Sequence, residues 1–175
     1  MKMAKKLLAV VLTGVLALSV LTGCGGAVST MIIAGEAVSA ETIADAMSNM
    51  SKGEGVVYEE KPELNEKAKQ IAAMISSAAM QEGKPDIYDK IMKIMGREYD
   101  KKYVWIAETT TKGCDVMTQA SNLLEDVDKD SNINSAVPKD KKPANVRYIG
   151  TAPITVNGVD YLFAVITADA VQGKV

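Results

Sequence analysis

Three aspartates at alternate positions are the clearest group of potential metal ligands in this sequence. Asp126, Asp128 and Asp130 place carboxylates at positions 1, 3 and 5 of a calcium-binding loop of the EF-hand type. Such a loop also needs a glycine at position 6 and a bidentate glutamate at position 12, where this sequence has Ser131 and Val137. The aspartates therefore predict a weak calcium site at best, and the alternative is a solvated loop that ends a helix.

Cys114 is a second candidate for chemistry. It lies where a helix is predicted to begin, and free backbone N–H groups at that position could favour the thiolate. A nucleophilic cysteine also needs a base, and the nearby choices are Lys112 and Asp115. The simpler interpretation is that Cys114 acts as a small, partly buried hydrophobic residue.

The sequence contains no histidine, which excludes several common kinds of active site. Ser-His-Asp triads, Cys-His pairs and Cys/His zinc clusters cannot be formed. There is also no glycine-rich loop that would hold phosphate, and there are no internal repeats. A hydrolase remains possible only if it uses carboxylates, Ser, Lys or Cys114.

The first 23 residues have the features of a secretory targeting segment. Lys2, Lys5 and Lys6 give a basic start, and a run of mainly apolar residues follows from Leu7 to Leu21. This run is shorter than the roughly 20 residues that a membrane-spanning helix requires. We expect residues 1–23 to be removed from the mature protein.

The segment ends in Leu21-Thr22-Gly23-Cys24, which resembles the lipobox of bacterial lipoproteins. The resemblance implies that Cys24 receives a diacylglyceryl group, that cleavage occurs before it, and that its new amino terminus is also acylated, for example with palmitate. Two or more chains anchor a protein stably, whereas one binds only marginally. The protein would then be attached to the cell membrane or envelope and face outside the cytoplasm. The alternative is an ordinary secretory peptide cut near residues 25–27.

Composition limits the partners of the mature chain. Residues 24–175 are enough for one domain with a core. The net charge of −2 becomes −5 when the three lysines of the leader are removed, which argues against nucleic acid as a partner. With Cys24 acylated, Cys114 has no partner for an intrachain disulfide. We interpret the ten methionines as core residues.

Periodicity and turn residues predict an alternation of helices and strands. A tether over residues 24–38 leads to a helix that Ser39 caps and that ends near Lys52. Thr111 is predicted to cap the last helix, and residues 125–143 are predicted to form a solvated loop that includes a small basic patch, Lys139-Asp140-Lys141-Lys142. The other helices are expected at residues 62–82 and 86–96, and a strand at residues 103–107.

The strongest local signal is Asn157-Gly158, which favours a two-residue hairpin turn with both residues at positive φ. Both faces of this hairpin are mainly apolar, so we expect it to lie between two layers of helices. Pro153 cannot donate a hydrogen bond and should lie at an edge or a bulge. The predicted cross-strand pairs are Val156 with Val159, Ile154 with Tyr161, Ala152 with Phe163, and Ile149 with Ile166.

Residues 41–168 resemble the CAP superfamily, which includes cysteine-rich secretory proteins, venom antigens and plant pathogenesis-related proteins. The resemblance implies an α-β-α sandwich. Many members form a cleft from two histidines and two acidic residues that can hold a metal, and this sequence cannot supply that site. No catalytic residue is carried over either. The segments of this sequence that resemble the family follow an opening helix that ends at Gly53. They are Val57-Tyr58, Leu64-Asn65-Glu66-Lys67-Ala68, Trp105-Ile106-Ala107, residues 116–121, Tyr148-Ile149-Gly150 and Tyr161-Leu162-Phe163.

Together these features predict an α+β fold, a three-layer α-β-α sandwich in which about four helices cover a small antiparallel sheet with a C-terminal hairpin. Residues 39–175 would form a single domain. The expected function is a lipid-anchored binding or interaction domain for an unknown protein or a small apolar ligand, with no cofactor apart from the weak calcium site. A pocket with two close carboxylates would favour the hydrolase, and a shallow apolar groove would favour binding.

Overall fold

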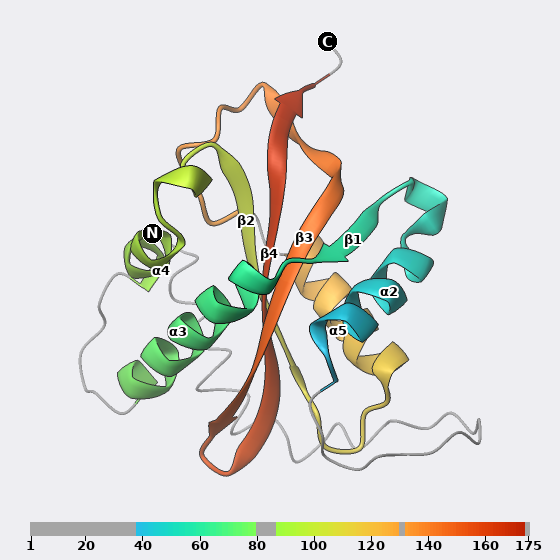
Figure 1. Cartoon of the computed structure of the whole chain (residues 1–175), viewed down its shortest axis with the longest axis vertical. Helices are drawn as coiled ribbons and strands as arrows, with labels where there is room; N and C mark the ends of the chain where they lie inside the picture. The colour runs from blue at the N-terminus through green and yellow to red at the C-terminus, as the bar shows by residue number, and fades with distance from the viewer. Residues whose placement is uncertain (1–37, 80–86, 130–131, 174–175) are drawn as a thin grey trace.

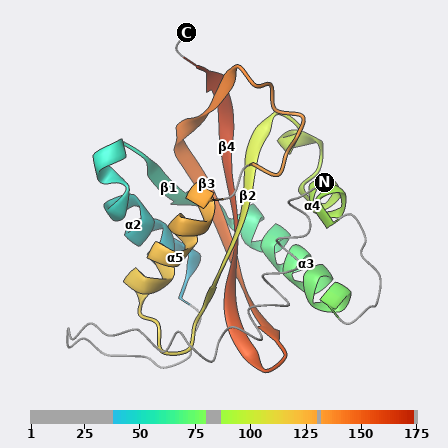
Figure 2. The same cartoon turned by 180° about the vertical axis from the view of Figure 1, so that it is seen from behind.

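The computed structural model describes residues 38–79, 87–129 and 132–173, which form a sheet with helices on both faces (Figure 1). The leader, Cys24, most of the tether, Asp86 and Asp130 lie outside these ranges. Two hydrophobic clusters, one on each face, confirm the three layers. Helices α2 (Ala40–Met50) and α5 (Val116–Lys129) cover one face, and α3 (Pro62–Ala79) and α4 (Ile87–Met95) cover the other (Figure 2).

The sheet has the strand order β1-β3-β4-β2. β1 (Val57–Glu60) runs parallel to β3 (Lys141–Val156), whereas β4 (Val159–Gln172) is antiparallel to both β3 and β2 (Lys102–Thr110). The predicted α+β fold is confirmed, but the sheet is mixed rather than antiparallel, because β1 pairs with β3 in parallel. β1 reaches β3 through a long crossover rather than a hairpin, so no local turn sets their relative direction.

The predicted hairpin is confirmed. Asn157 and Gly158 have φ values of 52° and 79°, and all four predicted cross-strand pairs are present. Neighbouring residues along each strand enter opposite layers. On β2, Trp105 packs against α2 and α5, while Ile106 packs toward α3 and α4.

Two predicted helix boundaries need correction. Asp115, not Thr111, caps α5, because the Thr118 backbone N–H donates to Asp115 Oδ1 at 2.8 Å. α2 has the predicted cap at Ser39 but ends at Met50, and a short 3-10 turn, Lys52–Glu54, follows it. A second 3-10 turn, Arg97–Tyr99, follows α4. The predicted end of α3 beyond Ala79 lies outside the described residues.

Two methionines that were predicted to be buried are exposed. Met117 is 50 % exposed, because the buried stripe of α5 passes through Ala120 and Leu123 on another side of the helix. Met50 is 42 % exposed, and Ser51 is buried at that end of α2 instead.

The prediction of a solvated loop over residues 125–143 is wrong in part. α5 extends to Lys129, and β3 begins at Lys141. Between them Asn134 is 5 % exposed, and its Nδ2 donates to the backbone carbonyls of Tyr99, Asp100 and Lys102 at 2.9 to 3.1 Å. The loop is therefore held against the start of β2.

The outer edge of β2 is closed by polar groups of the following segments. The Val104 N–H donates to Asn132 Oδ1 at 2.8 Å, and the Val104 carbonyl accepts from the Ile133 N–H at 2.9 Å. Further along, the Glu108 N–H donates to Asp126 Oδ2 at 3.1 Å. These bonds occupy backbone groups that could otherwise pair with another strand.

Helix α3 crosses β3 where β1 ends. The Lys61 N–H donates to the Ile149 carbonyl at 3.0 Å, and the Thr151 N–H donates to Asn65 Oδ1 at 2.9 Å. Amides two residues apart in a strand point to the same side, so the nitrogen of Pro153 also faces this free edge, where its missing N–H breaks no ladder bond. The expectation for Pro153 is thus confirmed.

Gly150 makes this crossing possible, since a Cβ atom there would overlap the backbone of Leu64 and Asn65. We predict that Gly150→Ala lowers the free energy of unfolding by about 3 kcal/mol or more, because backbone on both sides must move. Gly53→Ala is the control, since a Cβ there has no neighbour within 4 Å. Urea unfolding, monitored by circular dichroism, measures the free energy of unfolding of both variants. Equal unfolding midpoints for the two variants would contradict the prediction.

Candidate functional site

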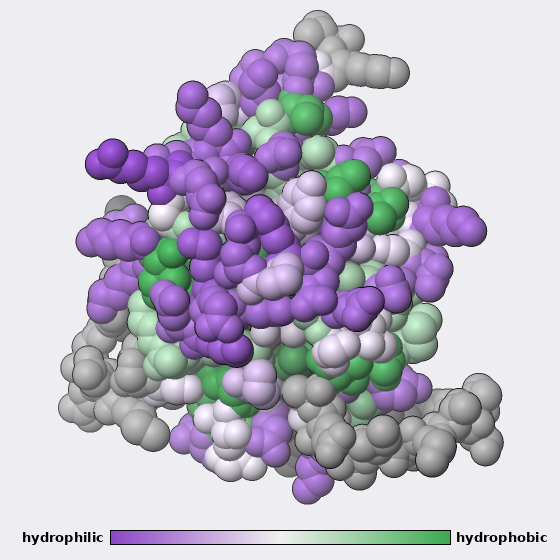
Figure 3. Space-filling view, in the orientation of Figure 1, coloured by the Kyte–Doolittle hydropathy of each residue, from purple (hydrophilic) through white to green (hydrophobic). Residues whose placement is uncertain are grey.

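An apolar recess opens between the later turns of α3 and the hairpin. Its cavity volume is about 10 Å3, which is space for about one water molecule. In the orientation of Figure 1, hydrophobic side chains reach the surface in separate patches, and several lie in the lower half around the hairpin (Figure 3). The recess is lined by Ile75, Glu108, Ile154, Val156, Tyr161 and Phe163.

Strand register brings these residues together. Glu108 on β2 lies opposite Phe163 on β4, and Ile154 on β3 lies opposite Tyr161. All four share the face that α3 covers. From α3 comes Ile75, which is 5 % exposed and belongs to the predicted buried stripe of that helix.

Glu108 carries the only carboxyl group in the lining. Burial in the apolar recess raises the pKa of Glu108 to about 7, and the negative charge of Asp126 adds to this effect. Among the described residues, no side chain or backbone group forms a hydrogen bond with the Glu108 carboxyl. Burial also raises the pKa of Tyr161, with a further contribution from the Glu108 charge.

A carboxyl group with this pKa exists in both protonation states near neutral pH, so it can donate or accept a hydrogen bond or bind a cation. Hydrolysis by carboxylates generally requires two such groups with different roles. The lining has one, and Asp126 is turned to the backbone of β2 rather than into the recess. The geometry therefore favours binding.

The predicted calcium ligands are only partly within the described residues. Asp126 and Asp128 both lie within α5, where residues two apart point in different directions. Asp128 is exposed, and Asp130 is outside the described ranges. In the part of the chain that can be described, no three His, Cys, Asp or Glu side chains are grouped to hold a metal ion. A weak calcium site stays a prediction.

Cys114 lies just before the cap of α5 rather than in the helix. Its Sγ is 3.8 Å from Thr110 Oγ1, and its carbonyl accepts from Gln119 Nε2 at 3.0 Å. The nearest candidate base, Asp115, accepts the backbone N–H of Thr118, and this bond lowers the pKa of Asp115. A carboxylate held in this way is a poor base.

The basic patch is divided between a turn and a strand. Lys139 is exposed in the turn, whereas Lys141 begins β3 and its Nζ donates to Gln172 Oε1 at 2.7 Å. The Lys141 carbonyl accepts from the Tyr103 hydroxyl at 2.7 Å. The patch thus contributes to pairing at the end of the hairpin.

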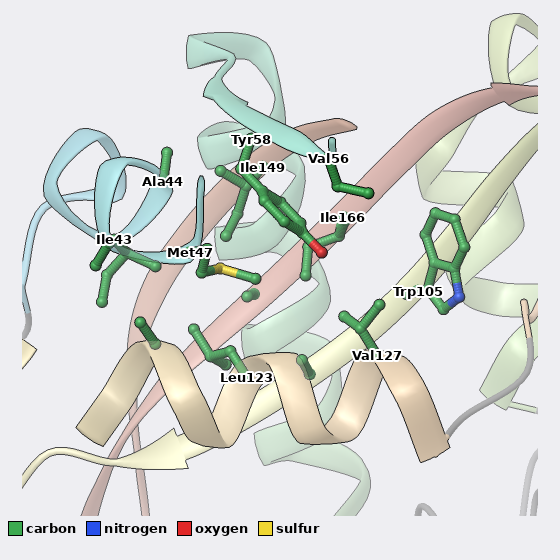
Figure 4. Packing of buried hydrophobic residues seen from close by; sticks show 14 of the residues in the cluster. Ile43, Ala44, Met47, Val56, Tyr58, Trp105, Leu123, Val127, Ile149 and Ile166 are labelled. Carbon is green, nitrogen blue, oxygen red and sulfur yellow. The ribbon is translucent and has the colours of Figure 1, made fainter. Parts of the chain in front are cut away.

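On the opposite face, Arg147 forms a cluster that the sequence did not indicate. Its guanidinium carbon lies 5.6 Å from the ring centre of Tyr58 and 5.3 Å from that of Trp105, and Nη1 donates to the Tyr58 hydroxyl at 2.9 Å. Tyr103 stacks on the far side of Trp105 at 5.4 Å. Figure 4 shows the Tyr58 hydroxyl pointing toward the side of the cluster where Trp105 and Val127 lie.

Arg147 is already stabilised by its surroundings. Two aromatic faces attract the guanidinium. Arg147 Nε is buried and has no hydrogen-bond partner among the described residues, but the two rings beside the guanidinium indicate a packing role for the residue.

Glu108 was also missed, although a signal for it was present. The strand from Tyr103 to Ala107 is apolar, and Glu108 follows in the same alternating series as Val104 and Ile106. A charged residue in a series that faces the core is unusual and marks a position to examine.

Comparisons with known proteins do not assign this chain to a family. No known family model matches the sequence, and no curated protein sequence is significantly similar to it. Within the described ranges, no helix combines the length and the apolar character needed to span a bilayer.

We predict that Glu108→Gln changes how stability depends on pH. Between pH 4.5 and about 7 the folded protein retains a proton that the unfolded chain has released, so the contribution of Glu108 to stability falls as pH rises. The variant should be more stable than the wild type by about 3 kcal/mol at pH 8 and nearly equal to it at pH 4. Urea unfolding at several pH values measures this difference. Glu59→Gln, on the exposed side of β1, is the matched control, and parallel curves for Glu108→Gln and wild type would contradict the prediction.

We also predict that Arg147→Lys lowers the free energy of unfolding by about 1 to 2 kcal/mol, because an ammonium group cannot stack flat between two rings. Arg97→Lys is the control, since Arg97 is exposed in a 3-10 turn. Thermal unfolding at one pH compares the two variants, and a loss of the same size in both would show that the stacking of Arg147 is unimportant.

Proposed function

We propose that this chain is a lipid-anchored binding or interaction domain that acts outside the cytoplasm. The leader and Leu21-Thr22-Gly23-Cys24 support the location. The recess supports the binding role. The α-β-α layering is consistent with a CAP-like domain that lacks the histidine-based metal site, and this relationship is part of the proposal.

One observation bears on the binding role: the partly buried carboxyl group of Glu108 lies beside an apolar recess, has a pKa raised to about 7, and has no hydrogen-bond partner among the described residues. Apolar pockets with a few polar groups of altered pKa are typical binding sites.

A hydrolase without histidine is the second candidate, and the structure supports it less well. It would use Glu108 as a general acid or base, and the pKa of Glu108 suits that role. However, the described lining supplies neither a nucleophile nor a second carboxylate. Binding requires nothing beyond the groups that are present.

We predict that the full-length protein takes up a clickable palmitate analogue when it is made in bacterial cells, and that Cys24→Ser abolishes this labelling and releases the protein from the membrane fraction. Cys114→Ser should remain labelled, which controls for cysteine loss in general. In-gel fluorescence and membrane fractionation measure the outcome. Labelling that survives Cys24→Ser would overturn the proposed anchor.

A further inference from the structure

We draw no further inference here: the strongest candidate, the acidic outer face of α2 and α5 on which Glu41, Asp45 and Asp128 are exposed, carries nothing, because nothing in the described part of the chain shows what covers it.

Discussion

The close approach of α3 to β3 at Gly150 determines much of the rest of this structure. No other residue type fits between the two backbones, so the sheet cannot move away from α3 at this point. Bonds on either side, from Lys61 to Ile149 and from Thr151 to Asn65, fix the direction in which α3 leaves the crossing. That direction carries the later turns of α3 over the free half of the hairpin, where Ile75 closes one side of the recess.

The position of Glu108 follows from two demands on an edge strand. The exposed edge of β2 must have its backbone groups satisfied, and Asp126 does this for the Glu108 amide. The alternation of the strand sends the Glu108 side chain to the face of α3, where the lining is apolar. The backbone N–H of this residue is therefore bonded, while its carboxyl has no hydrogen-bond partner within the described ranges, and the nearby Asp126 makes its ionisation still less favourable.

The sequence was sufficient wherever local chemistry determines geometry. Asn157-Gly158 sets one turn, and that turn sets every cross-strand pair of the hairpin, so the register and the apolar faces could be predicted. The parallel pairing of β1 with β3 could not, because no turn joins those strands. Glu108 was missed for a related reason. Its burial depends on α3 and the hairpin, which are distant from β2 in the sequence. No local pattern predicts which face of β2 these elements will cover.

Arg147 and Glu108 show how similar burial can have opposite consequences. Each is a charged residue on a strand that points into one of the two layers. The guanidinium of Arg147 lies beside two aromatic rings, which attract its positive charge. The carboxyl of Glu108 meets apolar walls and another negative group, so its charge is opposed on every described side. The layer around Arg147 therefore stabilises its charge, whereas the surroundings of Glu108 favour the neutral form of its carboxyl.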